Sequence, residues 1–237
     1  MSEFALKLAE TEALLQRIAE RFSAVSFASS LAAEDMVLTD LIFRNKLAIR
    51  IFTLDTGRLH AETLDMLPRI NAHYGQAVQV YRPIDTAVTE YVSQHGANAF
   101  YDSVELRKAC CQIRKVEPLN RALQDQQAWL TGQRRSQSST RNELAFEEDD
   151  GARGIKKFNP LAAWSEEDVW HYIRSYNVPY NILHDRNYPS IGCEPCTRAI
   201  QPGEDVRAGR WWWENPESKE CGLHLVDGKL VRIKQIA

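Results

Sequence analysis

The sequence predicts an α/β protein with a doubly wound, parallel β-sheet, and three observations support this. Short apolar runs alternate with amphipathic segments of helical period over residues 3–132, which is the pattern of successive β–α–β units. The chain has 237 residues, 44% of them hydrophobic, which is enough to bury a core without disulfides. Polar segments follow the apolar runs, as expected where loops at the carboxyl ends of parallel strands bind a ligand.

The first element is an amphipathic helix over residues 3–22, because its apolar residues recur at helical spacing. These residues are Phe4, Leu8, Leu15, Ile18 and Phe22. Short apolar runs predict strands at residues 24–28, 48–57, 77–83 and 128–132. Helices are predicted between and after these strands, at residues 34–43, 61–75, 85–96 and 110–123.

Single residues are expected to modify two of these helices, and a further stretch is expected to form a loop. Pro68 is expected to bend or restart the helix over residues 61–75, because proline lacks the N–H of a helical hydrogen bond. Gly96 is expected to end the helix that precedes it. Residues 147–151 read EEDDG, and this acidic, glycine-containing stretch predicts a solvated loop.

The last predicted helix covers residues 165–178, where Ser165 and Asp168 form a capping-box pattern. Beyond Pro179 the chain is rich in proline, glycine and tryptophan, which predicts a loop-dominated segment rather than an independent domain. The loops expected to bind a ligand are those that follow predicted strands: Ser29–Asp35, Asp55–His60 and Thr131–Arg141.

The charge and the apolar pattern exclude some classes of protein. The net charge of -3 argues against a general nucleic-acid-binding protein, which is usually basic. No apolar run approaches about 18 residues, so no membrane span is expected. The N-terminal stretch MSEFALKLAETEALLQ is acidic and lacks the basic and apolar regions of a signal peptide. We therefore expect a cytoplasmic protein.

The five cysteines are unevenly placed. Cys110 and Cys111 are adjacent, Cys193 and Cys196 form a Cys-x-x-Cys pair, and Cys221 stands alone. In a reducing compartment an odd number of cysteines favours metal ligands or nucleophiles over disulfide partners.

Four of these thiols form two pairs that an inorganic centre can share. Thiolates select zinc or iron–sulfur clusters, but structural zinc sites normally use two spaced pairs. An adjacent pair such as Cys110 and Cys111 suits a [4Fe–4S] cluster better, because each thiolate can take its own iron. Buried cysteines without a metal and a redox-active Cys193–Cys196 pair remain as alternatives.

Eight motifs occur in order along the chain. They read SSLAAEDMVL, LDTGRLHAET, CCQIRKVEPL, TGQRRSQSSTR, KFNPLAAW, IGCEPCTRAI, RAGRWWWE and KECGLH. Together they make the sequence resemble the assimilatory reductases of adenosine 5′-phosphosulfate (APS) and 3′-phosphoadenosine 5′-phosphosulfate (PAPS) over nearly the whole chain. The resemblance implies a Rossmann-like fold with a modified pyrophosphatase-type (PP) loop, of the adenine nucleotide alpha hydrolase-like kind.

The resemblance also implies a role for each cysteine. One [4Fe–4S] cluster per chain would be ligated by Cys110, Cys111, Cys193 and Cys196. Cys221, in the motif ECGLH, would be the nucleophile. Because family members that carry both cysteine pairs look like APS reductases, the resemblance favours APS as the substrate. It divides the chain into a reductase domain, residues 1–205, and a mobile tail, residues 206–237.

The PP-like loop departs from related ATP pyrophosphatases. Their loops are glycine-rich, whereas Ser29–Asp35 contains no glycine and so lets the backbone approach a phosphate less closely. Its two carboxylates, Glu34 and Asp35, would also compete with an anionic ligand near a helix N-terminus. This departure argues against an ATP-dependent ligase or sulfurylase and leaves the loop's contact with APS open.

The implied reaction attacks a sulfur atom surrounded by negative oxygens, so cations must gather there. Arginine suits this task because its planar fork matches phosphate and sulfate oxygens. The residues expected to contact substrate are Ser29, Ser30, Asp35, Asp55, Gly57, Lys115, Arg134, Arg135, Arg207, Arg210 and His224. Lys115 is expected to bridge cluster and substrate, and the other histidines are expected to be structural.

The implied mechanism has two steps. The thiolate of Cys221 attacks the sulfur and expels AMP, which leaves an S-sulfocysteine. Thioredoxin, or a glutaredoxin-like reductant, then releases sulfite. Trp211, Trp212 and Trp213 are interpreted as packing residues, with a thioredoxin dock as the alternative.

Three other functions remain open at this point. The first is reduction of PAPS, or of both nucleotides. The second is a non-catalytic protein that uses its cysteines as a zinc or redox-sensing centre. The third is an ATP-dependent enzyme of related fold. The oligomeric state is also open, with a homo-dimer and a homo-tetramer both compatible with the sequence.

Overall fold

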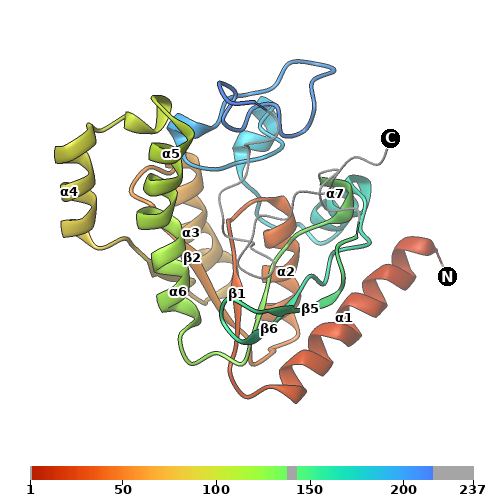
Figure 1. Cartoon of the computed structure of the whole chain (residues 1–237). Helices are drawn as coiled ribbons and strands as arrows, with labels where there is room; N and C mark the ends of the chain where they lie inside the picture. The colour runs from red at the N-terminus through yellow and green to blue at the C-terminus, as the bar shows by residue number, and fades with distance from the viewer. Residues whose placement is uncertain (1, 138–142, 216–237) are drawn as a thin grey trace, which may run out of the picture.

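A computed structural model describes residues 2–137 and 143–215 (Figure 1). Its centre is a six-stranded sheet with the strand order β3-β2-β1-β4-β6-β5. The strands are β1 (Val25–Ala28), β2 (Arg50–Leu54), β3 (Gln79–Tyr81), β4 (Ala128–Leu130), β5 (Glu147–Asp150) and β6 (Ile155–Phe158). All neighbouring pairs are parallel except β5 with β6. The predicted α/β class and parallel sheet are confirmed.

Helices cover both faces of the sheet, as expected of a doubly wound fold. They are α1 (Glu3–Arg21), α2 (Ala33–Arg44), α3 (Ala61–Tyr74), α4 (Asp85–His95), α5 (Val104–Cys111), α6 (Glu117–Leu123) and α7 (Glu166–Ser175). On β4 the side chain of Leu130 joins the core formed with α1, α2, α3 and α7, whereas Trp129 joins the smaller core formed with α6. This alternation follows from the two-residue period of a strand.

Two predicted element ends are confirmed. The Ser165 hydroxyl accepts from the Asp168 N–H at 3.1 Å, and the Asp168 carboxylate accepts from the Ser165 N–H at 2.8 Å, which completes the capping box. Gly96 ends α4 at a φ of 93°. Helix α3, in contrast, continues through Pro68 without a second start.

The prediction of a solvated loop at residues 147–151 is wrong, because Glu147–Asp150 form the edge strand β5. Its acidic side chains lie opposite lysines of β6: Lys156 Nζ is 2.7 Å from Asp149 Oδ1, and Lys157 Nζ is 2.8 Å from Glu148 Oε1. Cross-strand ion pairs and an edge position let a strongly charged sequence form a strand.

The single helix predicted over residues 110–123 is also corrected. Helix α5 begins at Val104, with Ser103 as its N-cap, so the adjacent cysteines lie in its last turn. A five-residue π-helical turn, Gln112–Val116, then leads into α6. Such turns are rare and are frequently found at functional sites.

The C-terminal part that the structure describes, residues 179–215, contains only 3₁₀ turns and isolated bridges, as predicted. In Figure 1 it passes above the sheet to the side of α5. Bridges join Leu59 to Cys193 and Thr197 to Arg210. The predicted tail boundary between residues 205 and 206 stays a prediction, because residues 216–237 lie outside the described ranges. Across the described ranges, no helix has the length and apolar character needed to cross a membrane.

Candidate active site

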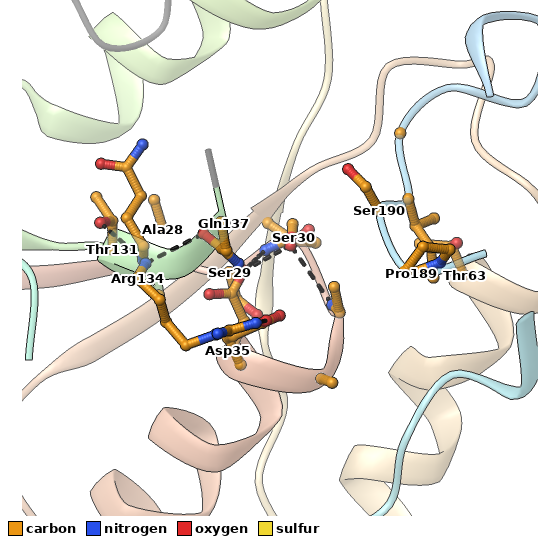
Figure 2. Close-up of a pocket in the computed structure, with 18 of the residues that line it drawn as sticks. Ala28, Ser29, Ser30, Asp35, Thr63, Thr131, Arg134, Gln137, Pro189 and Ser190 are labelled. Atoms are coloured by element: carbon orange, nitrogen blue, oxygen red, sulfur yellow. Dashed lines mark hydrogen bonds and ion pairs between the residues drawn. The ribbon is translucent and has the colours of Figure 1, made fainter. Parts of the chain in front are cut away.

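A cavity of about 270 Å³ lies at the carboxyl ends of β1, β2 and β4. Figure 2 shows one wall with Ser29, Ser30 and Arg134, which follow β1 and β4. Pro189 and Ser190, from the segment that precedes Cys193, form the facing wall. Each of the three loops predicted to bind a ligand contributes to the lining, as expected for a parallel sheet.

The PP-like loop is held in shape by Asp35. The Asp35 Oδ2 atom accepts hydrogen bonds from the Ser30 N–H at 2.5 Å and from the Ser30 hydroxyl at 2.6 Å. Leu31 adopts a φ of 64°, the left-handed conformation that glycine usually supplies in such a turn. Burial raises the pKa of Asp35 to about 6, against the lowering effect of its hydrogen bonds with Ser30.

Gly132 lets the loop after β4 approach Asp35 closely. A Cβ atom built on Gly132 would lie 2.0 Å from Asp35 Oδ1. The Gly132 backbone also hydrogen-bonds Asp35. Asp35 therefore joins the two loops on this side of the cavity, and only glycine fits at position 132.

A second connection between these loops is the ion pair of Arg134 with Glu34. Arg134 Nη2 lies 2.8 Å from Glu34 Oε1, and the two side chains are only 5% and 13% exposed. Arg134 also donates to the Ser136 hydroxyl at 2.6 Å. The charge of Arg134 is therefore largely compensated within the protein before any ligand binds.

His184 lines the cavity, and its contacts are structural, as the sequence analysis expects. Its Nε2 atom accepts a hydrogen bond from the Ala33 N–H, at the start of α2, over 3.1 Å. Its ring packs edge-on against Trp170. Burial lowers the pKa of His184, which favours the neutral acceptor form. No sequence signal marks this role, because it depends on a contact between residues 151 positions apart.

The four paired cysteines line a second, smaller cavity beside the first. Cys110 and Cys111 come from the end of α5, and Cys193 and Cys196 come from the C-terminal segment, which the Leu59–Cys193 bridge holds to the loop after β2. Cys193 Sγ is 3.2 Å from the Thr56 hydroxyl. The structure thus brings together the two pairs that the sequence analysis grouped.

The surroundings of these thiols shift their pKa values in different directions. Burial by itself raises the pKa of the Cys193 thiol, but Lys115 and the Thr56 hydroxyl outweigh it and the pKa is lowered. Burial and the neighbouring Cys193 raise the pKa of Cys196 to about 12, and burial also raises the pKa of Cys110. The neighbouring cation thus favours the thiolate form of Cys193, whereas burial disfavours this form at Cys110 and Cys196.

These residues are compatible with an iron–sulfur cluster. A metal centre would supply the positive charge that deprotonates all four thiols. Among the described residues, no three histidine, cysteine or acidic side chains converge closely enough to hold a single metal ion.

Lys115 and Trp211 line both cavities. Lys115 belongs to the π-helical turn that follows the adjacent cysteines. Trp211 is 1% exposed, packs with Cys193 and Cys196, and adopts a φ of 41°. The two cavities are therefore adjacent, and a cation lies between them.

The structure places the remaining predicted site residues as follows. Arg207 and Arg210 line the larger cavity. Asp55, Gly57 and Arg135 do not line it: Asp55 pairs with Arg82 at 2.9 Å, and Arg135 donates to the Leu144 carbonyl. Gly57, at a φ of 69°, lies against the Arg114 guanidinium. Cys221 and His224 lie outside the described residues.

Fold and site together define an α/β protein whose ligand pocket, at the carboxyl ends of a doubly wound sheet, adjoins a four-thiol centre. The family model of the phosphoadenosine phosphosulfate reductase domain matches residues 24–199. The chain belongs to this family.

Several relatives extend over most of the chain. The adenosine 5′-phosphosulfate reductase of Burkholderia cepacia is 62% identical over 223 residues, which cover 94% of this chain and 89% of that protein. The protein of the same name from Agrobacterium fabrum is 48% identical and covers 84% of this chain and 76% of its own length.

Solved structures agree with the fold. The phosphoadenylyl-sulfate (PAPS) reductase of Candida auris, determined as a phosphate complex, has a TM-score of 0.69 and 27% identity, covering 81% of this chain and 90% of that chain. Candida glabrata FMN adenylyltransferase has a TM-score of 0.58 at 13% identity, covering 97% and 77%. At this low identity, the similarity to FMN adenylyltransferase supports a shared fold and nothing more. The predicted Rossmann-like fold is confirmed.

Proposed function

We propose that this chain reduces APS to sulfite and AMP in assimilatory sulfate reduction, with a thioredoxin or a glutaredoxin-like protein as the reductant. The observation that carries the proposal is the shared lining of the two cavities by Lys115 and Trp211. It joins a pocket suited to a nucleotide to a four-thiol centre through one cation. A zinc or redox-sensing protein would need no such adjoining pocket.

The substrate is oriented by charge. The phosphosulfate end of APS lies at Lys115, Arg207 and Arg210, where cations stabilise the charge that develops on the reacting oxygens. The nucleoside end points to the loop that carries Ser29 and Asp35, because the Asp35 carboxylate disfavours an anion there. Arg134 acts mainly by holding this loop, since Glu34 already compensates its charge.

The nucleophile is Cys221. Its thiolate attacks the sulfur, the bond between sulfur and the AMP phosphate oxygen breaks, and AMP leaves with the bonding electrons. The S-sulfocysteine that results is attacked at Cys221 Sγ by one thiol of the reductant, and sulfite departs. The second thiol of the reductant then frees Cys221, so that the dithiol supplies the two electrons.

Cys110, Cys111, Cys193 and Cys196 would hold one [4Fe–4S] cluster per chain. When bound, the cluster supplies a compact charged centre that orders the site and tunes its electrostatics. Lys115 faces both this centre and the substrate pocket, and Thr56 orients Cys193. We place the reaction in the cytoplasm, where such thiols remain reduced.

APS is favoured over PAPS because the relatives with 48% to 62% identity are named adenosine 5′-phosphosulfate reductases. PAPS reduction is the second candidate, supported by the 27% identical Candida auris PAPS reductase. Turnover of the two nucleotides at equal concentration separates these functions, and a strong preference for PAPS would overturn the choice of substrate.

The mechanism is tested by incubating anaerobically purified protein with APS and no reductant, followed by mass spectrometry. We expect a sulfonate adduct on Cys221 that reduced thioredoxin removes as sulfite. Cys221→Ser should form neither adduct nor sulfite, yet keep its iron and inorganic sulfide. Sulfite production by Cys221→Ser at the wild-type rate, or stoichiometric zinc without iron in the wild type, would contradict the proposal.

A further inference from the structure

Arg107 and Glu214 form a fully buried ion pair that the mechanism above does not use. The side chains of Arg107 and Glu214 are 0% and 3% exposed. Two parallel hydrogen bonds join them, Nε to Oε1 at 2.8 Å and Nη2 to Oε2 at 2.7 Å. This bidentate geometry is the strongest that a guanidinium and a carboxylate can form.

The pair connects two parts of the molecule that are far apart in sequence. Arg107 belongs to α5 and lies one helical turn before Cys111, with which its side chain also hydrogen-bonds. Its guanidinium carbon lies 4.6 Å from the centre of the Trp211 ring. Glu214 follows the tryptophans near the end of the described chain. The helix of the adjacent cysteines and the end of the described chain are therefore fixed to each other.

A gain in stability does not by itself explain why the protein has a buried ion pair here. Taking two charges out of water is costly, and replacing a buried ion pair with apolar residues is often neutral or stabilising. The gain that a bidentate pair does offer is a fixed geometry between its two partners. Arg107 and Glu214 meet where a precise position would matter, because Arg107 lines the four-thiol cavity and Glu214 precedes Cys221 by seven residues.

Chain length links this position to the nucleophile. Cys221 is seven residues beyond Glu214. An extended chain spans at most about 3.3–3.6 Å per residue, so the Cα atom of Cys221 lies within about 25 Å of that of Glu214. Fixing Glu214 thus fixes one end of the seven-residue stretch that leads to Cys221.

We propose that the Arg107–Glu214 pair anchors the C-terminal tail so that Cys221 reaches the substrate sulfur, which makes both residues positioning residues for sulfur transfer. This inference rests on the proposed function, in which Cys221 is the nucleophile. Because an anchor of the tail acts after the nucleotide is bound, its loss slows transfer to Cys221 but leaves the affinity for APS unchanged.

The test compares Glu214→Ala and the isosteric Glu214→Gln with Glu204→Ala. Glu204 pairs with Arg198 at 2.8 Å in the same segment, but this pair is partly exposed. Each iron-loaded variant is mixed with saturating APS without reductant, and the rate of adduct formation on Cys221 is followed by quenched-flow mass spectrometry. The dissociation constant for APS and the iron and sulfide contents are measured on the same samples.

We expect both Glu214 variants to slow adduct formation by about tenfold to a hundredfold, as misplacement of a reacting group does. Their affinity for APS and their iron content should stay at the wild-type level, and Glu204→Ala should behave as the wild type. Should Glu214→Ala fail to fold, Glu214→Gln keeps the volume of the side chain and carries the test. Arg107→Lys keeps the charge but loses the planar guanidinium that makes the two hydrogen bonds. Adduct formation should therefore be slow in this variant too.

Wild-type rates of adduct formation in an iron-loaded Glu214→Gln variant would overturn the inference. So would a rate that falls only in proportion to lost iron, because the pair would then act on the thiol centre rather than on the tail. Failure of the proposed function has a different signature: the wild type itself would then form no adduct on Cys221.

Discussion

Glu34 and Arg134 hold the two loops of one cavity wall together through a buried ion pair with an N···O distance of 2.8 Å. Glu34 is in the first turn of α2, and Arg134 follows β4. Since both side chains are almost fully buried, neither can lose its partner without leaving a charge in a poorly solvated place. The pair therefore has a structural role next to a binding surface.

Replacing Arg134 with glutamine should therefore lower the free energy of unfolding by about 3–5 kcal/mol, the usual cost of breaking a buried pair. Urea unfolding followed by circular dichroism gives this value. Arg186→Gln is the matched control, because Arg186 pairs with Glu62 at 2.7 Å but is 57% exposed. Its effect should stay below about 1 kcal/mol. Equal effects of the two substitutions would contradict this interpretation.

The pKa of Asp35 predicts a pH dependence of stability. Burial raises this pKa from 3.8 to about 6, so the folded protein holds the proton more tightly than the unfolded chain. Stability should fall as the pH rises from about 4 to about 6 and then level off, with a loss of about 1–3 kcal/mol. Asp35→Asn should remove this slope and raise stability at pH 7.5, measured by urea unfolding between pH 4 and 7.5. If Asp35→Asn keeps this dependence of stability on pH, another titratable group causes it.

Much of the fold follows from local patterns in the sequence. The alternation of apolar runs with amphipathic helices predicts the parallel sheet, and the Ser165–Asp168 pattern predicts a helix start that the structure confirms. The pocket loops follow for a topological reason, because the carboxyl ends of parallel strands share one edge of the sheet. Ser29 and Thr131 thus lie on one cavity although they come from different loops.

The features that the sequence does not predict depend on contacts between separate elements of the fold. The strand Glu147–Asp150 looks like a solvated acidic loop until the lysines of β6 lie opposite it. The buried ion pair of Arg134 with Glu34, 100 residues away, carries no signal in the sequence around either residue. His184 carries no local signal for its contact with Ala33. In each case the contact joins two different elements of the fold, and no pattern within one element encodes it.

The hydrogen bond from Ala33 to His184 predicts a second pH effect, opposite in sign. Because burial lowers the pKa of His184, the folded protein prefers the neutral ring, and its contribution to stability is lost as the pH falls below about 6.5. Glu34, Asp185 and Glu166 face the ring and moderate this shift without reversing it. His184→Gln, which keeps an acceptor, should flatten the loss between pH 7.5 and 5.5. If His184→Gln loses as much stability between pH 7.5 and 5.5 as the wild type, His184 is not the source of that loss.

Two glycines should respond differently to alanine. At Gly132 a Cβ atom would meet Asp35, which Ser30 holds in place, so Gly132→Ala should cost about 1–3 kcal/mol of stability. At Gly192 a Cβ atom would lie 2.4 Å from Arg210 Nη2, the end of a flexible side chain that can move away. Gly192→Ala should therefore keep most of its stability but raise the KM for APS. An unchanged KM would show that Arg210 does not contact the substrate from this position.

Lys115 offers the most direct test of the junction between the two cavities, because it is a cation that lines both. Lys115→Met keeps most of the apolar stem and removes the charge. We expect kcat/KM for APS to fall by about a hundredfold, as it does when one preorganised charge is removed from a reacting centre. Iron content should remain, since the four thiols are unchanged. Lys108→Met is the control, because Lys108 is exposed on α5 and lines neither cavity. If the two variants lose the same activity, the charge at the junction has no special role and substrate orientation must come from Arg207 and Arg210.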